Sequence, residues 1–167
     1  SASDVYTGQR LGGNQLLETL KPFVYRKYLD FGAIEAIRSM KALIERELQY
    51  QDMSDHIKLG RGGIREIEFV VQSHQIIYGG RHQTLQTASI WLALTALESL
   101  GIVDHQCVEQ LCSAYDFLRR LEPRLQVLDD QQTHRIPTGS VEKRRIATAM
   151  NFESESHLLS RLNQVTE

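Results

Sequence analysis

The chain has 167 residues, a length typical of one domain that buries a core without disulfides or a structural metal. Hydrophobic residues make up 41% and charged residues 24%, a globular composition that excludes a disordered chain. The formal net charge of −2 excludes a protein that coats nucleic acid by overall charge, and no apolar run is long enough to span a membrane.

Apolar residues recur at spacings of three and four along most of the chain, which predicts helices. The sequence has only 3 prolines and almost no alternating pattern. It therefore predicts an all-α fold, a helical bundle of six or seven helices with one glycine-rich interruption. We expect a single helical domain over 1–167, with a short helical lead-in at 14–30 that is split at Pro22, and a bundle over 31–167.

The first helix of this bundle is predicted between Asp30 and about Tyr50. Its inward face is expected to hold Ile34, Ile37, Met40, Ile44 and Leu48. Glycines at 60, 62 and 63 then interrupt the helical pattern, because glycine is unfavourable inside a helix. The residues just before them, 57–59, are expected to form a short extended piece.

Two helices are predicted after the glycines. The first covers 64–78, ends at the glycine pair that follows it, and carries a stripe of Ile64, Ile67, Val71 and His74. The second covers about 88–100 and is apolar around most of its circumference, so we expect it at the centre of the bundle.

The longest predicted helix begins after Asp104 and ends near Asp130, with a length of about 40 Å. Pro123 lies inside it and is expected to bend rather than end it, because the apolar stripe continues in phase. Two short helices are predicted near 141–150 and 155–164.

Other polar and sulfur-containing residues favour structural roles. Cys107 and Cys112 are predicted to pack without a disulfide, which favours a reducing, cytoplasmic location. Histidine and cysteine spacings do not support a zinc site. The basic triplet 143–145, and the group of Arg119, Arg120 and Arg124 with Glu122, are predicted to be solvated helix faces rather than nucleic-acid contacts.

The segment most informative about function is 57–69, Ile-Lys-Leu-Gly-Arg-Gly-Gly-Ile-Arg-Glu-Ile-Glu-Phe. Glycines before a helix let backbone N–H groups approach a ligand, and the helix dipole there favours phosphate. Cations would strengthen such a site, and carboxylates could face a metal or act as acid or base. The candidate residues, phosphate-proximal or at a domain interface, are Lys58, Arg61, Gly62, Gly63, Arg65, Glu66 and Glu68. The alternative is a simple glycine turn with Arg65 and Glu66 solvated.

Residues 58–69 resemble the signature of bifunctional glutamine synthetase adenylyltransferase/adenylyl-removing enzymes. A shorter form of this signature recurs in the related PII uridylyltransferases. The stretches 22–31, 40–44, 117–122 and 132–137 fit the same family in the same order, so that the resemblance covers most of the chain.

The resemblance implies a cytoplasmic enzyme of nitrogen regulation that moves AMP on and off a tyrosine of glutamine synthetase. ATP and magnesium would be cofactors of the full-length enzyme, and its own catalytic domain, glutamine synthetase and PII protein would be partners, with no nucleic acid or membrane. The chain would be a fragment, the helical domain that follows the N-terminal nucleotidyltransferase-like domain.

One departure from the family pattern limits what this chain does. The family's Gly-Ser and Asp-x-Asp motif, which holds the metal ions, does not occur in residues 1–167. No catalytic residue, metal ligand or bound cofactor is therefore expected here, and the isolated fragment is expected to be inactive. The alternative is a free-standing helical protein-interaction module with no role in catalysis.

Overall fold

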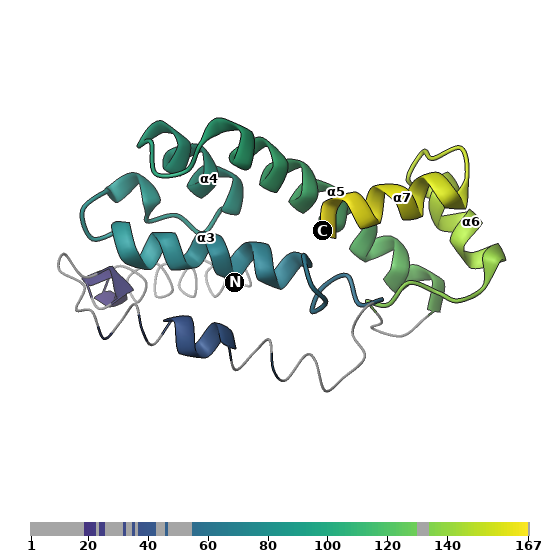
Figure 1. The fold of residues 1–167 in the computed structure, drawn as a ribbon, viewed down its shortest axis with the longest axis horizontal. Coiled ribbons are helices and arrows are strands. Elements are labelled where there is room, and N and C mark those ends of the chain that lie inside the picture. The colour runs from purple at the N-terminus through teal and green to yellow at the C-terminus, as the bar shows by residue number, and fades with distance from the viewer. Residues whose placement is uncertain are drawn as a thin grey trace, which may run out of the picture.

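The computed structural model describes residues 19–22, 24–25, 32, 35, 37–42, 46, 55–129 and 134–166. Between 55 and 166 they form α3 (Ile64–Tyr78), the 3-10 helix η1 (Gln83–Leu85), α4 (Ile90–Ser99), α5 (His105–Asp129), α6 (Ser140–Ala149) and α7 (Glu155–Thr166), as Figure 1 shows. Within the described ranges, the extended pairing is one isolated bridge between His56 and Arg135. The prediction of an all-α fold is confirmed. The division into a lead-in at 14–30 and a bundle stays a prediction, because much of the lead-in lies outside the described residues.

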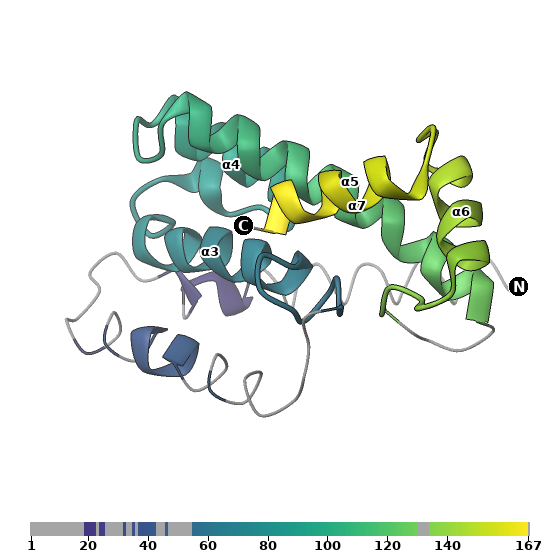
Figure 2. The same ribbon diagram turned by 45° about the vertical axis from the view of Figure 1, so that its right-hand side comes forward.

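The helices share one hydrophobic core because α5 touches each of the other four. Helices α3 and α4 pack against α5, α6 lies near the end of α5, and α7 runs back from α6 along the middle of α5 (Figures 1 and 2). The fully buried side chains come from all five helices and include Ile64, Val71, Leu94, Leu97, Leu118, Leu121, Leu125, Ile146 and Leu158.

Helix α4 does not lie at the centre of the bundle, contrary to our expectation. It buries a single stripe, and its outward residues Trp91 and Leu92 are 45% and 62% exposed. The helix contacts α3, η1 and α5 and leaves its remaining face to solvent. The apolar composition of α4 does not reveal how many neighbouring helices cover its apolar side chains.

The buried stripe of α3 ends one residue later than predicted. His74 is only half-buried, whereas Gln75 is 6% exposed. The Gln75 side-chain amide donates to the carbonyl oxygens of Leu85 (2.7 Å) and Thr87 (2.8 Å), which satisfies a buried polar group and ties α3 to the chain before α4. The predicted stop after Tyr78 is confirmed.

The predicted inward face of the helix over 30–50 is also shifted. Residues 37–42 are helical, and Ile37 and Lys41 on one face are half-buried, but Met40 is 48% exposed. The Lys41 Nζ lies 3.8 Å from the Glu66 Oε1, so the face that turns to α3 passes through Lys41 rather than Met40. The other three predicted inward residues lie outside the described residues.

Helix α5 begins and continues as predicted. The Asp104 Oδ1 accepts from the Cys107 amide at 2.9 Å, and the helix runs through Pro123 to Asp129. Both cysteines are free thiols, and Cys112 packs against the core. The two short C-terminal helices are confirmed, within two residues of the predicted bounds.

Candidate functional site

We call residues 57–63 the glycine turn. The prediction of an extended piece at 57–59 is wrong, because these residues form a turn and the bridge lies one residue earlier, at His56. The Ile57 amide donates to the His134 carbonyl (2.9 Å), and the Gly60 amide then folds back to the His56 carbonyl (2.7 Å). The fold-back ends the extended pairing before a strand can form.

Two glycines of the turn have steric reasons to be glycine. Gly62 has φ +65°, a left-handed conformation that other residues rarely adopt, and a Cβ there would lie 2.5 Å from the Thr166 Cα at the end of α7. A Cβ on Gly63 would lie 2.7 Å from the carbonyl oxygens of both Ile57 and Gly60. The glycines therefore serve the packing of the turn itself.

The backbone N–H groups at the start of α3 already have acceptors inside the turn. Gly62 N donates to Glu66 Oε2 (2.7 Å), Gly63 N to Gly60 O (3.0 Å), Ile64 N to Ile57 O (3.1 Å) and Arg65 N to Lys58 O (3.0 Å). A phosphate bound by these amides would have to displace protein acceptors. Any hydrogen-bond donors that the turn can provide to a ligand are therefore side-chain groups rather than backbone amides.

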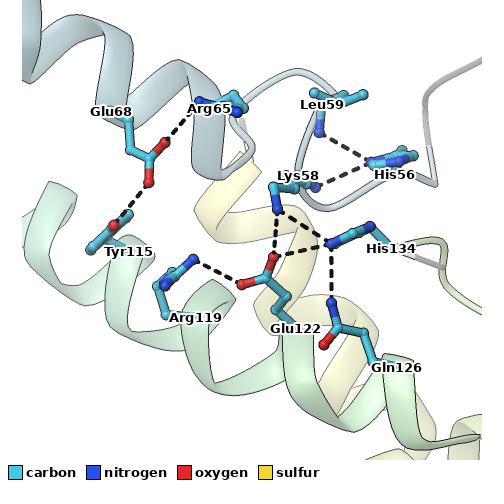
Figure 3. Close-up of polar contacts among 10 residues, drawn as sticks. All are labelled: His56, Lys58, Leu59, Arg65, Glu68, Tyr115, Arg119, Glu122, Gln126 and His134. Atoms are coloured by element: carbon cyan, nitrogen blue, oxygen red, sulfur yellow. Dashed lines mark hydrogen bonds and ion pairs between the residues drawn. The ribbon is translucent and has the colours of Figure 1, made fainter. Parts of the chain in front are cut away.

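The candidate residues predicted from the sequence face three different surroundings. Arg61, Gly62 and Glu66 line an open groove of about 1040 Å³ whose other walls are α5 and the last turn of α7. The Glu66 carboxylate is occupied by the Gly62 amide and also lies near Lys41. Lys58 faces α5, whereas Arg65 lies beside Glu68, which faces Tyr115 (Figure 3).

Lys58 belongs to an ionic group around a buried carboxylate, which we call the Glu122 cluster and which is formed by Glu122, Lys58, Arg119 and His134 (Figure 3). The Glu122 carboxylate lies 3.1 Å from Lys58 Nζ, 2.9 Å from Arg119 Nη1 and 3.1 Å from His134 Nε2. Glu122 is only 8% exposed. Burial raises the pKa of this carboxyl, but the hydrogen bond from Lys58 and the neighbouring cations outweigh it and hold the pKa below its ordinary value.

His56 extends this cluster toward the backbone of the turn. Its ring stacks on that of His134, with centroids 5.5 Å apart and planes at 17°. The His56 Nδ1 accepts from the amides of Lys58 (3.3 Å) and Leu59 (3.1 Å), which requires that this nitrogen carry no proton. Burial, and then the charges of His134 and Arg135, lower the pKa of His56, so that its neutral form is favoured.

Arg65, Glu68 and Tyr115 form a separate row of contacts between α3 and α5. The Arg65 Nη1 lies 3.7 Å from the Glu68 carboxylate, which accepts from the Tyr115 hydroxyl at 3.1 Å. Burial raises the pKa of Tyr115, and its hydrogen bond to Glu68 adds to the shift. The Arg65 side chain is 64% exposed whereas that of Glu68 is 20% exposed, so the guanidinium lies at the surface beside the carboxylate and is open to a ligand.

Sequence reasoning missed the central residue of this region. It assigned Glu122 and Arg119 to a solvated helix face, yet Glu122 is buried. Two signals were available: Glu122 follows Leu118 by four residues on the apolar stripe of α5, and the stretches 117–122 and 132–137 both belong to the family resemblance. The structure brings these stretches together at Glu122 and His134.

The described residues do not fit a magnesium site. The carboxylates of Glu66, Glu68 and Glu122 each accept from protein donors or lie beside cations. Over the same part of the chain, no group of three or more His, Cys, Asp or Glu side chains could hold a metal ion. Among the described helices, none has both the length and the apolar character needed to cross a membrane.

Comparisons with known proteins agree on one family. Residues 38–167 match the family model described as GlnD PII-uridylyltransferase. The chain is 47% identical over 90% of its length to the bifunctional glutamine synthetase adenylyltransferase/adenylyl-removing enzyme of Idiomarina loihiensis. It is 47% identical over 96% to the enzyme of the same name from Nitrosococcus oceani, and 45% identical over 95% to that of Pseudomonas aeruginosa. The chain spans 16% of the length of each of these relatives.

Proposed function

The chain belongs to the GlnD PII-uridylyltransferase family, and from this premise we propose that it is the helical domain of an enzyme that adenylylates and deadenylylates glutamine synthetase in nitrogen regulation. High identity over most of the chain to enzymes with this name supports the proposal. The chain spans 16% of their length, so the reaction would depend largely on residues outside it. The longer enzyme would be cytoplasmic and would use ATP and magnesium, with glutamine synthetase and PII protein as partners.

Within that enzyme, we propose that the glycine turn packs against the catalytic domain and borders its active site. The observation that supports this proposal is the contrast between two cations, Lys58 in the glycine turn and Arg65 in the first turn of α3. Lys58 is hydrogen-bonded to Glu122, whereas Arg65 lies at the surface within 3.7 Å of the Glu68 carboxylate. A guanidinium presented in this way can bind phosphate or carboxylate through two parallel hydrogen bonds. Arg65, at the start of α3 directly after the glycine turn, is therefore the side chain that we expect to act on the bound substrate.

Substitution of Arg65 in the longer enzyme tests this role. Arg65→Ala should lower deadenylylation of glutamine synthetase by at least about tenfold, equivalent to about 1.4 kcal/mol of barrier, with a nearly unchanged melting temperature. Arg65→Lys should restore only part of the activity, because an ammonium lacks the planar fork. Arg120→Ala is a matched control, since Arg120 is a half-exposed arginine paired with Asp116 one helical turn away.

Each outcome of this experiment separates the roles of the turn. If activity falls only in step with stability, Arg65 is a structural strut between domains. If neither activity nor stability changes, the turn is solvated surface and the proposed site is wrong. Turnover by the purified chain of 167 residues alone would show instead that the chemistry lies within these residues.

A Gly-Ser and Asp-x-Asp motif encoded shortly before Ser1 in the same reading frame would support the enzyme domain and exclude the alternative of a free-standing interaction module. Its absence from that reading frame would favour the module. This observation needs only the upstream sequence.

A further inference from the structure

We propose that Glu122 is the positioning residue of the glycine turn, because its carboxylate fixes the turn to α5 and thereby sets where Arg65 stands. The inference rests on the proposed function only for the statement that the turn borders an active site. Its structural part concerns Glu122 and the turn alone, and can be tested without any catalytic assay.

Three segments of the chain meet at this one carboxylate. Lys58 comes from the glycine turn, Arg119 comes from α5 itself, and His134 comes from the segment between α5 and α6. A backbone hydrogen bond also joins the turn to the segment between α5 and α6, because the Ile57 amide donates to the His134 carbonyl. Glu122 therefore holds both the turn and the segment against which the turn pairs.

Apolar packing anchors the turn at one end, through Ile57, which belongs to the hydrophobic core. Of its side chains only Ile57 is buried, at 3% exposed, whereas Leu59 is 36% exposed. The remaining turn residues are glycines or cations. The hydrogen bond between Lys58 and Glu122 adds a polar contact that joins the turn to α5. Because Glu122 is buried, this charge-assisted bond is screened by water much less than a surface ion pair would be.

Loss of the carboxylate charge should release the turn in a specific way. Without it, the cations of Lys58 and Arg119 would lie close together beside His134 with no counter-charge. Lys58 has a flexible stem and can reach water, so its ammonium would leave first, and the turn would lose its polar contact with α5. Two backbone bonds would then open, those from the Ile64 amide to the Ile57 carbonyl and from the Arg65 amide to the Lys58 carbonyl.

Amide hydrogen exchange measured residue by residue by NMR tests this positioning role. In Glu122→Gln, which keeps the shape of the side chain, the amides of Ile64 and Arg65 should exchange at least about tenfold faster. The amide of Ala93, which donates to the Ser89 carbonyl in α4, should change much less and serves as the internal reference. Glu109→Gln is the matched control, because Glu109 lies on the same helix with a 70% exposed side chain.

A uniform rise in exchange across the turn and α4 would mean general destabilisation and would overturn the proposal, as would no rise in the turn. If Glu122→Gln fails to fold, Lys58→Met removes the other partner, leaves Glu122 with Arg119 and His134, and should give the same local rise. The result is independent of the activity test on Arg65. Faster exchange in the turn, combined with full activity of Arg65→Ala, would retain Glu122 as the anchor and reject the turn as part of the active site.

Discussion

The contact between the glycine turn and the end of α7 gives a sharp prediction for Gly62→Ala. The structure holds a matched control in Gly101, because the two glycines have nearly the same left-handed backbone, with φ +65° and +66°. A Cβ on Gly62 would lie 2.5 Å from the Thr166 Cα and 2.7 Å from its carbonyl carbon. A Cβ on Gly101 would meet nothing within 4 Å. The pair therefore separates backbone strain from crowding.

The magnitudes follow from these two terms. A left-handed conformation costs an L residue with a Cβ about 1–2 kcal/mol, and both substitutions carry that term. Gly62→Ala adds an overpacking term of about 1–3 kcal/mol, because the crowded atoms belong to the backbone of Thr166 and have no rotamer to change. We expect a loss of about 2–5 kcal/mol for Gly62→Ala and about 1–2 kcal/mol for Gly101→Ala.

Urea unfolding followed by tryptophan fluorescence measures both losses. The chain has 1 tryptophan, Trp91, which packs edge-on against Tyr115 at 5.0 Å between ring centroids, so its emission reports on the core between α4 and α5. With an m-value of about 2 kcal/mol per molar urea, the extra loss in Gly62→Ala should lower the midpoint by about 1 M relative to Gly101→Ala.

Equal losses in the two variants, within about 0.5 kcal/mol, would refute the reasoning. That result would mean that the last turn of α7 moves aside at no cost and does not press on the glycine turn. A larger loss in Gly101→Ala would contradict it further, since nothing crowds that position.

Three further predictions use the same unfolding assay. Leu118→Ala removes a fully buried side chain of α5 and should cost about 2–5 kcal/mol, whereas Leu92→Ala at a 62% exposed position should stay within about 0.5 kcal/mol of the parent chain. Asp104→Ala removes the N-cap of α5 and should cost about 1 kcal/mol. The lowered pKa of His56 means that the unfolded chain binds protons more readily than the folded one, so stability should fall as the pH drops below 6.5. His56→Gln should remove most of that fall. The raised pKa of the exposed His105 acts in the opposite direction and should be screened by about 0.5 M salt.

The sequence was sufficient to predict where the helices lie along the chain, but not which of their faces other helices cover. Spacing of apolar residues located α3 and α5 closely, because those helices bury a stripe that repeats over many turns. It also gave the span of α4 but wrongly placed this helix at the centre of the bundle, since Trp91 and Leu92 look like core residues until the number of neighbouring helices is known. Periodicity reports which face of a helix is apolar, whereas the packing of other elements on that face depends on the whole topology.

In the candidate site, too, local features could be predicted from the sequence whereas contacts between distant residues could not. The glycines before α3 correctly marked a turn, but the engagement of its amides by residues such as Glu66 depends on a close fold-back that spacing does not reveal. The position of Glu122 depends on residues 64 and 12 positions away that meet only in three dimensions. Its charge alone suggested a surface residue, because carboxylates are rarely buried without partners.

The contact of Gly62 with Thr166 also means that the end of α7 packs directly on the backbone of the glycine turn. Side chains absorb small displacements by changing rotamer, but here a main chain rests on a main chain with no side chain between them. A displacement of the last turn of α7 toward Gly62 would therefore have to move the backbone of the turn, and Arg65 lies only three residues further along. The hydrogen bond between the Gly62 amide and Glu66 joins this contact to the first turn of α3, so a shift of Gly62 would also displace the start of that helix.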